Sequence, residues 1–328
     1  MRALYFGTYD RGHPRNVNAI AAMRATGIDV EERHASVRRG GWLGALNVVV
    51  AETKLFVSRP SAFDVVIVGY PGHFDVPRAR RLAGGRALVF DAVLSLENEL
   101  VEVRRRIGAR STTARVLRAV DFQALRLPDL VVCGTRVEAD YLEERGARRT
   151  EAIFLGADEG LFSETWAPAY PFSALYVADP SHDVVDEAIG MAGVPVDVLD
   201  AGDLREDDAG IRFGHAGIVL GSFRESRAIP PSVFAALATG VPVITADTPA
   251  ACELLADGDS AVLVPPDDPQ ALASAIALLA ADEPLRARIA AGGRSAFEEH
   301  ASRRVLGERW HAALHGNALR QEIRAERD

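Results

Sequence analysis

The sequence holds few of the residues that build disulfide scaffolds or metal sites. It has only two cysteines among 328 residues, Cys133 and Cys252, and they lie far apart in apolar surroundings. Disulfide frameworks and structural metal sites need paired or clustered ligands at short spacing, and no such spacing occurs. We therefore expect two buried thiols and no metal.

Long apolar stretches are lacking too. No run reaches the roughly 18 apolar residues that a membrane span requires. The first residues, MRALYFG, have neither the apolar stretch nor the small-residue cleavage site of a signal peptide. We expect a cytoplasmic protein.

Lysine is almost absent, since Lys54 is the only one among 37 basic residues. Charge is divided unevenly along the chain. Residues 1–150 carry 24 basic against 17 acidic side chains, a net charge of +7, and residues 151–328 carry 13 against 29, a net charge of −16. Nucleic acid is an unexpected partner for so acidic a half, because a phosphate backbone is bound by a continuous cationic stripe. The basic half remains suited to an anionic membrane surface or a phosphorylated substrate.

What is present is an ordinary globular composition, with 48% hydrophobic and 25% charged residues, and a length that suits two domains. Short apolar β-branched runs alternate with helical patterns, which predicts parallel sheets covered by helices. In the first part we expect strands at residues 3–6, 64–68, 87–90, 130–133 and 152–155. The intervening helices are expected at 17–26, 42–57, 76–82, 97–106, 114–125 and 137–145.

A stretch with two prolines, 166–171, predicts a linker, because proline disfavours helix. A second series of strands follows at 175–178, 196–199, 218–221, 243–246 and 261–264. Its helices are expected at 184–191, 232–239, 250–255, 269–279 and 284–291, and residues 294–328 have a helical pattern. The predicted fold class is α/β, with Rossmann-like domains at 1–165 and 172–300 and a helical tail, 301–328, that packs back on the first domain.

Residues 229–269 read IPPSVFAALATGVPVITADTPAACELLADGDSAVLVPPDDP. This segment resembles the donor-domain signature of the group 1 (family 4) glycosyltransferases, in which a helix ending in Ala-x-Gly is followed by Pro-Val-Ile and, later, Leu-Val-Pro-Pro-x-Asp. Residues 155–162 look like the end of that family's first domain. The resemblance implies a GT-B fold, two Rossmann-like domains facing across a cleft. It also implies sugar transfer from a nucleotide diphosphate donor, with retention and without a metal or other cofactor.

A diphosphate needs positive charge, and a helix N-terminus with unpaired amides is a ready source. Pro230 and Pro231 precede a helix that Ser232 is placed to cap. We expect the donor to contact Arg224, Ser232, Val233, Thr248 and Glu253, and we assign leaving-group stabilisation to Arg227.

Two departures from the family pattern leave other functions open. Arg227 and Ala235 occupy the positions of the family's paired glutamates, and residues 176–183 replace its Lys-Gly donor segment. No arginine or lysine occurs between Thr150 and Leu204. The alternatives are a catalytically degenerate homologue that acts as a binding or partner protein, and a nucleotide-sugar epimerase, which shares the architecture.

Acceptor contacts are expected at the ends of the first three predicted strands. The loop 6–16 contains glycines that let a ligand approach the backbone, and a purely structural turn is the alternative. His73 and Asp91 follow the next two strands, where a solvated histidine and a capping aspartate are the alternatives. The residues expected to bind the acceptor are Gly7, Thr8, Tyr9, His13, Arg15, Asn16, His73 and Asp91.

A basic cluster suggests a peripheral contact with the inner membrane face, as in membrane-associated members of the family. Its residues are Arg104, Arg105, Arg106, Arg110, Arg115 and Arg118, with Arg38, Arg39 and Trp42 opening another helix. The alternative is a solvated helical face. Asp257 and Asp259 match the Asp-x-Asp pattern of metal-dependent transferases, but they lie in a turn where the family has Asp-Gly, so no metal is expected there. The acceptor, the sugar and the oligomeric state stay open.

Overall fold

The computed structural model divides into two compact units, one formed by Met1–Ile153 with Leu306–Asp328 and the other by Phe154–Val305. The structure describes residues 1–35, 62–93, 95, 108, 111–162, 166–168, 171–179, 181–200 and 208–325, and side chains of the last helix up to residue 316. The predicted helices at 42–57 and 97–106 lie outside the described residues.

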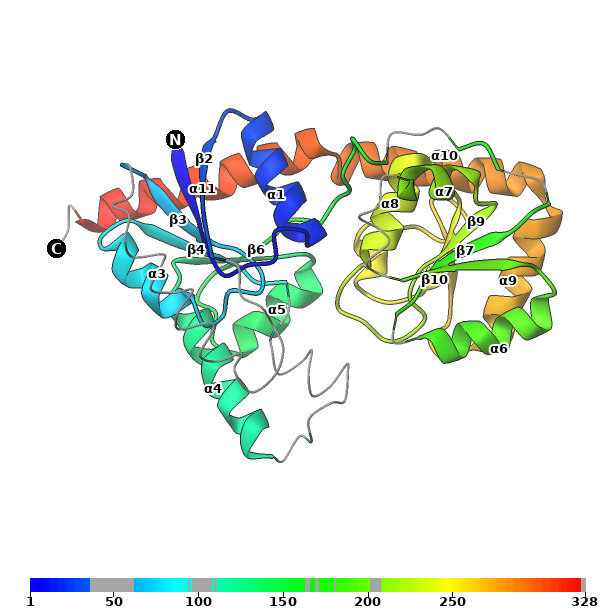
Figure 1. Cartoon of the computed structure of the whole chain (residues 1–328), viewed down its shortest axis with the longest axis horizontal. Coiled ribbons are helices and arrows are strands. Elements are labelled where there is room, and N and C mark those ends of the chain that lie inside the picture. The colour runs from blue at the N-terminus through cyan, green and yellow to red at the C-terminus, as the bar shows by residue number, and fades with distance from the viewer. Residues whose placement is uncertain are drawn as a thin grey trace. The chain divides into compact units, whose positions relative to one another are not determined.

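Unit 1 is built on a six-stranded parallel sheet (Figure 1). Its strands, in spatial order, are β2 (Asp29–His34), β1 (Arg2–Gly7), β3 (Val65–Val68), β4 (Ala87–Asp91), β5 (Leu130–Cys133) and β6 (Thr150–Ala152). Its helices are α1 (Pro14–Ala25), α3 (Val76–Ala83), α4 (Thr112–Arg126) and α5 (Arg136–Glu144).

The four central strands of this sheet, β1, β3, β4 and β5, are apolar at nearly every position. All residues of β3, β4 and β5 are buried, as expected of parallel strands covered on both faces. Phe6, Val68 and Phe90 form one cluster with Ala79 of α3 and Leu142 of α5. The strand β2 was not predicted, because its sequence DVEERH is charged. Such a sequence is tolerated at a sheet edge, and among the described strands β1 alone pairs with β2.

Unit 2 has a five-stranded parallel sheet, in the order β11 (Val262–Val264), β10 (Val243–Ala246), β9 (Ile218–Leu220), β7 (Ala174–Val177) and β8 (Val196–Leu199). Its helices are α6 (His182–Ala192), α7 (Ala209–His215), α8 (Pro231–Thr239), η3 (Ala251–Glu253), α9 (Pro269–Ala281) and α10 (Glu283–His300). The core joins Tyr176, Leu220 and Ile244 of the sheet to Val185 of α6 and Ile276 of α9. Two parallel α/β domains are thereby confirmed.

The last helix, α11 (Arg303–Ala325), starts in unit 2 and packs in unit 1, which confirms that the tail returns to the first domain. Gly307 lies against α1 so closely that a Cβ would be 2.5 Å from the carbonyl oxygen of Ala22. Trp310 is only 1% exposed, and its ring centroid lies 5.8 Å from Cζ of the Arg15 guanidinium. Residues far apart in sequence thus complete one core.

The division between the units lies after Ile153, earlier than the predicted linker at 166–171. Trp166 and Ala167 belong to unit 2, because their amides donate to the carbonyl oxygens of Thr239 and Gly214. The stretch with two prolines therefore begins with residues that are already hydrogen-bonded to unit 2.

Some local predictions differ from the structure. The predicted helix 250–255 is a short 3-10 turn, η3, and α7 was not predicted. Cys252 is exposed, so its prediction as a buried thiol is wrong. In a turn this short only Ala251 faces inward, and the Cys252 thiol donates to Asp247 Oδ1 at 3.2 Å. Both thiols are free, as expected.

Candidate functional site

Each sheet has a point where the strand order reverses, between β1 and β3 in unit 1 and between β7 and β9 in unit 2. In open α/β sheets, ligands bind outside the carboxyl ends of the strands at such switch points. The two loops that leave a switch point diverge to opposite faces of the sheet and leave space between them. A ligand site in each unit is therefore expected at its switch point.

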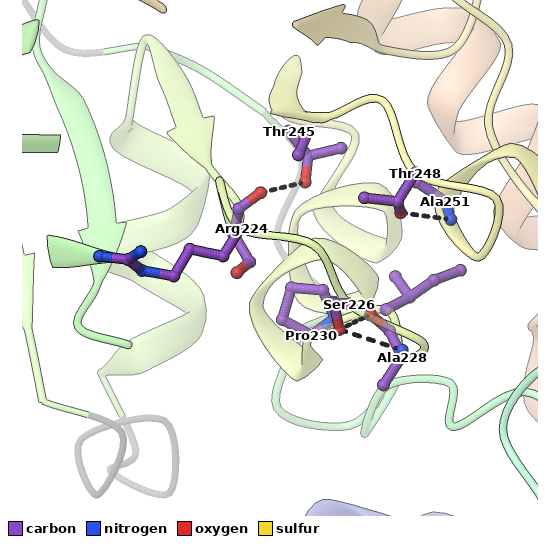
Figure 2. A pocket seen from close by; sticks show the side chains of 10 residues that line it. Arg224, Ser226, Ala228, Pro230, Thr245, Thr248 and Ala251 are labelled. Atoms are coloured by element: carbon purple, nitrogen blue, oxygen red, sulfur yellow. Dashed lines mark hydrogen bonds between the residues drawn. The ribbon is translucent and has the colours of Figure 1, made fainter. Parts of the chain in front are cut away.

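A pocket lies at the carboxyl ends of β9 and β10, next to the switch point of unit 2 (Figure 2). It is lined mostly by small and polar residues, which let a ligand approach the backbone. They are Ser222, Arg224, Ser226, Ala228, Ile229, Pro230, Thr245, Ala246, Thr248 and Ala251. Two of the predicted donor-binding residues, Arg224 and Thr248, are among them.

The N-terminus of α8 offers fewer amides than the sequence reasoning assumed. Pro230 is the N-cap and Pro231 the first helical residue, and neither has an N–H. The amide of Val233 already donates to the Pro230 carbonyl at 3.1 Å. The prediction that Ser232 caps the helix is wrong: it lies inside the first turn, 4% exposed, and makes no capping hydrogen bond. Within this first turn, Ser232 N–H is the amide left for an anion.

Arg224 is the cation of the pocket lining. Its Nη2 donates to both carboxylate oxygens of Asp183, at 2.7 and 2.6 Å, and its Nη1 donates to Asp267 Oδ1 at 3.1 Å. These hydrogen bonds lower the pKa of Asp183 and raise that of Arg224. The guanidinium is therefore charged and already has two counter-ions.

The other predicted donor residues lie around the pocket without lining it. Val233 is fully buried, and its side chain would contact a Cβ added at Gly221. Glu253 ends η3, and Arg227 is half-buried in the loop before α8. A donor contact by these residues, and the leaving-group role of Arg227, stay predictions.

Residues 218–296 match the family model described as glycosyl transferases group 1. This segment is a group 1 glycosyltransferase domain. The resemblance drawn from the sequence is thereby confirmed, as is the assignment to the transferases, and the pocket lies within the matched residues. No curated protein sequence matches the chain.

Solved structures of glycosyltransferases match nearly the whole chain. HepE of Anabaena in complex with UDP-glucose aligns with a TM-score of 0.66 at 18% identity, over 96% of this chain and 100% of that chain. Sucrose-phosphate synthase from Thermosynechococcus elongatus aligns with a TM-score of 0.70 at 16% identity, over 99% of both chains. A glycosyltransferase from Rickettsia africae aligns with a TM-score of 0.61 at 13% identity, over 96% and 98%. The fold is GT-B, as expected.

At the switch point of unit 1, Asp75 joins the loop after β1 to the loop after β3. Its Oδ2 accepts hydrogen bonds from the amide and the hydroxyl of Thr8, at 2.8 and 2.9 Å. Gly7 has φ of 129°, and a Cβ there would lie 2.7 Å from the same oxygen. Glycine is thus required at position 7 for two reasons, the positive φ and the closeness of the Asp75 carboxylate. Sequence reasoning missed Asp75, although its place at the N-cap of α3, at the end of the loop that leaves β3 at the switch point, was a usable signal.

The side chain of Asn16 joins the same two loops, the one after β1 and the one after β3. Its Nδ2 donates to the carbonyl oxygens of Asp10 and Tyr70, at 2.7 and 2.6 Å, and its Oδ1 accepts from Tyr5 Oη and from the Tyr70 amide. Asn16 is fully buried, and the hydrogen bonds of its side chain are made to other groups of the protein. Its predicted contact with an acceptor stays a prediction; what the structure shows is a loop anchor.

Arg15 and Asp91 form a buried ion pair with 2.7 Å between Nε and Oδ1, at 2% and 0% side-chain exposure. The Arg15 Nη1 also donates to the Ile153 carbonyl at 2.5 Å. Although burial alone would lower it, the Asp91 carboxylate holds the pKa of Arg15 above its usual value. Among the described residues, the Asp91 carboxylate accepts hydrogen bonds from Arg15 Nε and Tyr5 Oη and caps no loop. Acceptor contact by this pair stays a prediction.

The remaining acceptor candidates lie at the same end of the sheet. Tyr9 is 1% exposed, and its hydroxyl donates to Glu32 Oε2 at 2.9 Å. His13 caps α1 by accepting from the Arg15 amide. His73 is 2% exposed and packs its ring on Phe90, so the alternative of a solvated histidine is wrong. The structure brings the candidates together, and their contact with an acceptor stays a prediction.

Of the basic cluster, Arg115 and Arg118 lie exposed on α4, and the other members lie outside the described residues. Over the described ranges, no helix is both long and apolar enough to cross a bilayer. Within the same ranges, no group of three or more His, Cys, Asp or Glu residues is arranged to hold a metal ion. Asp257 instead accepts from the Leu263 amide at 2.9 Å.

Proposed function

We propose that this chain transfers a sugar from a nucleoside diphosphate sugar to a glycan, lipid or natural-product acceptor. The pocket beside Arg224 carries the proposal, because it lies at the carboxyl ends of β9 and β10 inside the group 1 glycosyltransferase domain. UDP is the nucleotide to test first, since HepE, which shares the fold, was crystallised with UDP-glucose.

The chemistry asked of the pocket is leaving-group stabilisation. The bond between the sugar's anomeric carbon and the diphosphate breaks, and the diphosphate leaves with the electron pair and the developing charge. The acceptor hydroxyl bonds to the anomeric carbon and gives up its proton, which the leaving phosphate can take. Arg224 of the pocket lining, Arg227 in the loop before α8 and the Ser232 amide in the first turn of α8 are the groups proposed to hold that charge. We propose retention of configuration, following the family.

The acceptor is proposed to bind at the switch point of unit 1, where the loop anchored by Asp75 and Asn16 lies. Arg115 and Arg118, exposed on α4, are the described residues that support a peripheral contact with an anionic membrane. Both proposals go beyond the transferase assignment.

A second candidate function has its own support. Arg227 and Ala235 stand where the family has two glutamates, and Ala235 is 2% exposed within α8. In the family, the glutamate at the position of Ala235 accepts hydrogen bonds from the ribose of the donor. Without that carboxylate, the domain would bind nucleotide weakly and serve as a binding protein without transfer.

Calorimetric titration of UDP, GDP and dTDP tests the proposal. We expect saturable binding of UDP by the wild type. Arg224→Ala should weaken it roughly tenfold or more, because a charge-assisted hydrogen bond is worth about 1.5–3 kcal/mol. Arg212→Ala is the matched control: Arg212 is also paired with an aspartate of unit 2, Asp197, but does not line the pocket. Arg227→Ala should weaken binding as well.

The outcomes separate the candidates. If none of the three nucleotides binds, the transferase proposal fails. If UDP binds but neither hydrolysis of UDP-sugars nor transfer to any acceptor in a screen occurs, the binding-protein candidate is preferred. Unchanged affinity of Arg227→Ala removes that residue from the donor site.

A further inference from the structure

The pocket cation is tied to loops from both sides of the unit 2 switch point. Arg224 follows β9, Asp183 lies in the first turn of α6 after β7, and Asp267 lies in the turn after β11. Arg224 donates to Asp183 through Nη2 and to Asp267 through Nη1, so both of its Nη atoms have carboxylate partners. In Figure 2 its side chain extends away from the labelled serine, threonine and proline residues of the lining.

The backbone holds Asp267 in place beside Arg224. Its amide donates to the Phe223 carbonyl at 2.8 Å, which attaches the turn after β11 to the residue preceding Arg224. Asp267 has φ of 56°, a left-handed conformation that aspartate and asparagine adopt more readily than other side chains. Its carboxylate is therefore positioned by the turn rather than meeting Arg224 by chance.

The charges of this cluster oppose an anionic ligand. One guanidinium faces two carboxylates, so the three side chains together carry a formal charge of −1. The double proline leaves Ser232 N–H as the amide offered by the first turn of α8. A diphosphate that enters the pocket must displace the carboxylates of Asp183 and Asp267 from Arg224 before the guanidinium can compensate its negative charge.

We propose that Asp183 and Asp267 compete with the donor's diphosphate for Arg224 and so set the affinity of the pocket for nucleoside diphosphates. The inference rests on the proposed function, since it concerns the same pocket. The exchange is feasible because the side chains of Arg224, Asp183 and Asp267 are 38%, 61% and 54% exposed. Ion pairs with this exposure contribute little to stability and are easily broken.

The test compares UDP affinity across charge-removing variants. Asp183→Asn should bind UDP about two- to tenfold more tightly than the wild type, because one competitor and one repelling charge are removed. Asp267→Asn should give a smaller gain in the same direction, and asparagine tolerates the left-handed backbone. Asp197→Asn, which releases Arg212 in the same unit, is the control for general charge effects and should stay within twofold.

A double variant isolates the competition. In the Arg224→Ala background, Asp183→Asn should lose most of its gain, because nothing is left to compete for. If Asp183→Asn binds UDP equally or more weakly than the wild type, or if its gain persists fully without Arg224, the competition is refuted while the proposed function stands. If neither the wild type nor any variant binds a nucleotide, the proposed function fails and takes the inference with it.

Discussion

At the scale of single residues, the two units use arginine in opposite ways. Arg15 is 2% exposed and bonded to Asp91 and to the carbonyl of Ile153, so its partners are fixed by the core of unit 1. Arg224 is partly exposed and held by carboxylates that a ligand can displace. The first serves the fold, and the second is proposed to serve binding.

Replacing Arg15 should therefore destabilise the protein strongly. We expect Arg15→Met to lower the free energy of unfolding by about 3–5 kcal/mol, because Asp91 would be left as an uncompensated buried charge. Urea unfolding measures the change. Arg2→Met, which breaks an exposed pair with Asp29 in the same unit, should cost under about 1 kcal/mol. Equal effects of the two substitutions would contradict the assignment of Arg15 as a core residue.

The sequence predicted several residues of the pocket in unit 2 and of the switch point in unit 1, but it did not predict which side chains they contact. Arg224 was predicted from its place just ahead of the expected helix N-terminus, and Thr248 was among the residues expected to contact the donor; both line the pocket. The environment of Arg15 depends on residues 76 to 295 positions away, which no local pattern reveals. The capping role of Ser232 failed because Pro230 takes the N-cap position itself.

At the scale of elements, strands were predictable where they are apolar throughout. β3, β4 and β5 have no polar residue before their final position, which is why their bounds agree within one residue with the expected ones. The edge strand β2 and the short α7 lack such a pattern. The close approach of α11 to α1 was not predictable, since Gly307 looks no different from any other glycine in a helical stretch.

That approach can be tested within a single helix. Gly307→Ala should destabilise unit 1, because the added Cβ would lie 2.5 Å from the Ala22 carbonyl oxygen and 2.6 Å from the Thr26 methyl group. Gly316→Ala is the matched control in α11: apart from its chain neighbours and the backbone of its own helix, no described atom lies within 4 Å of its added Cβ, so alanine should be neutral or stabilise by up to about 1 kcal/mol. Thermal unfolding should show opposite or clearly unequal shifts. Equal shifts would mean that α11 does not pack as described.

At the scale of the whole molecule, the alternation of strands and helices was enough to predict two α/β domains. The point of division was not predictable, because the proline-rich stretch at 166–171 is already attached to unit 2 by the Trp166 and Ala167 amides. The acidic balance of residues 151–328 was visible in the sequence. The sequence did not show that two of these acidic residues, Asp183 and Asp267, pair with Arg224 of the pocket.

The most direct test of this account is a crystal structure of the protein with UDP. We predict a β-phosphate oxygen within hydrogen-bonding distance of the Arg224 guanidinium, beside the N-terminus of α8, with the contact between Arg224 and Asp183 broken. UDP bound elsewhere, with Arg224 still held by both carboxylates, would contradict the account.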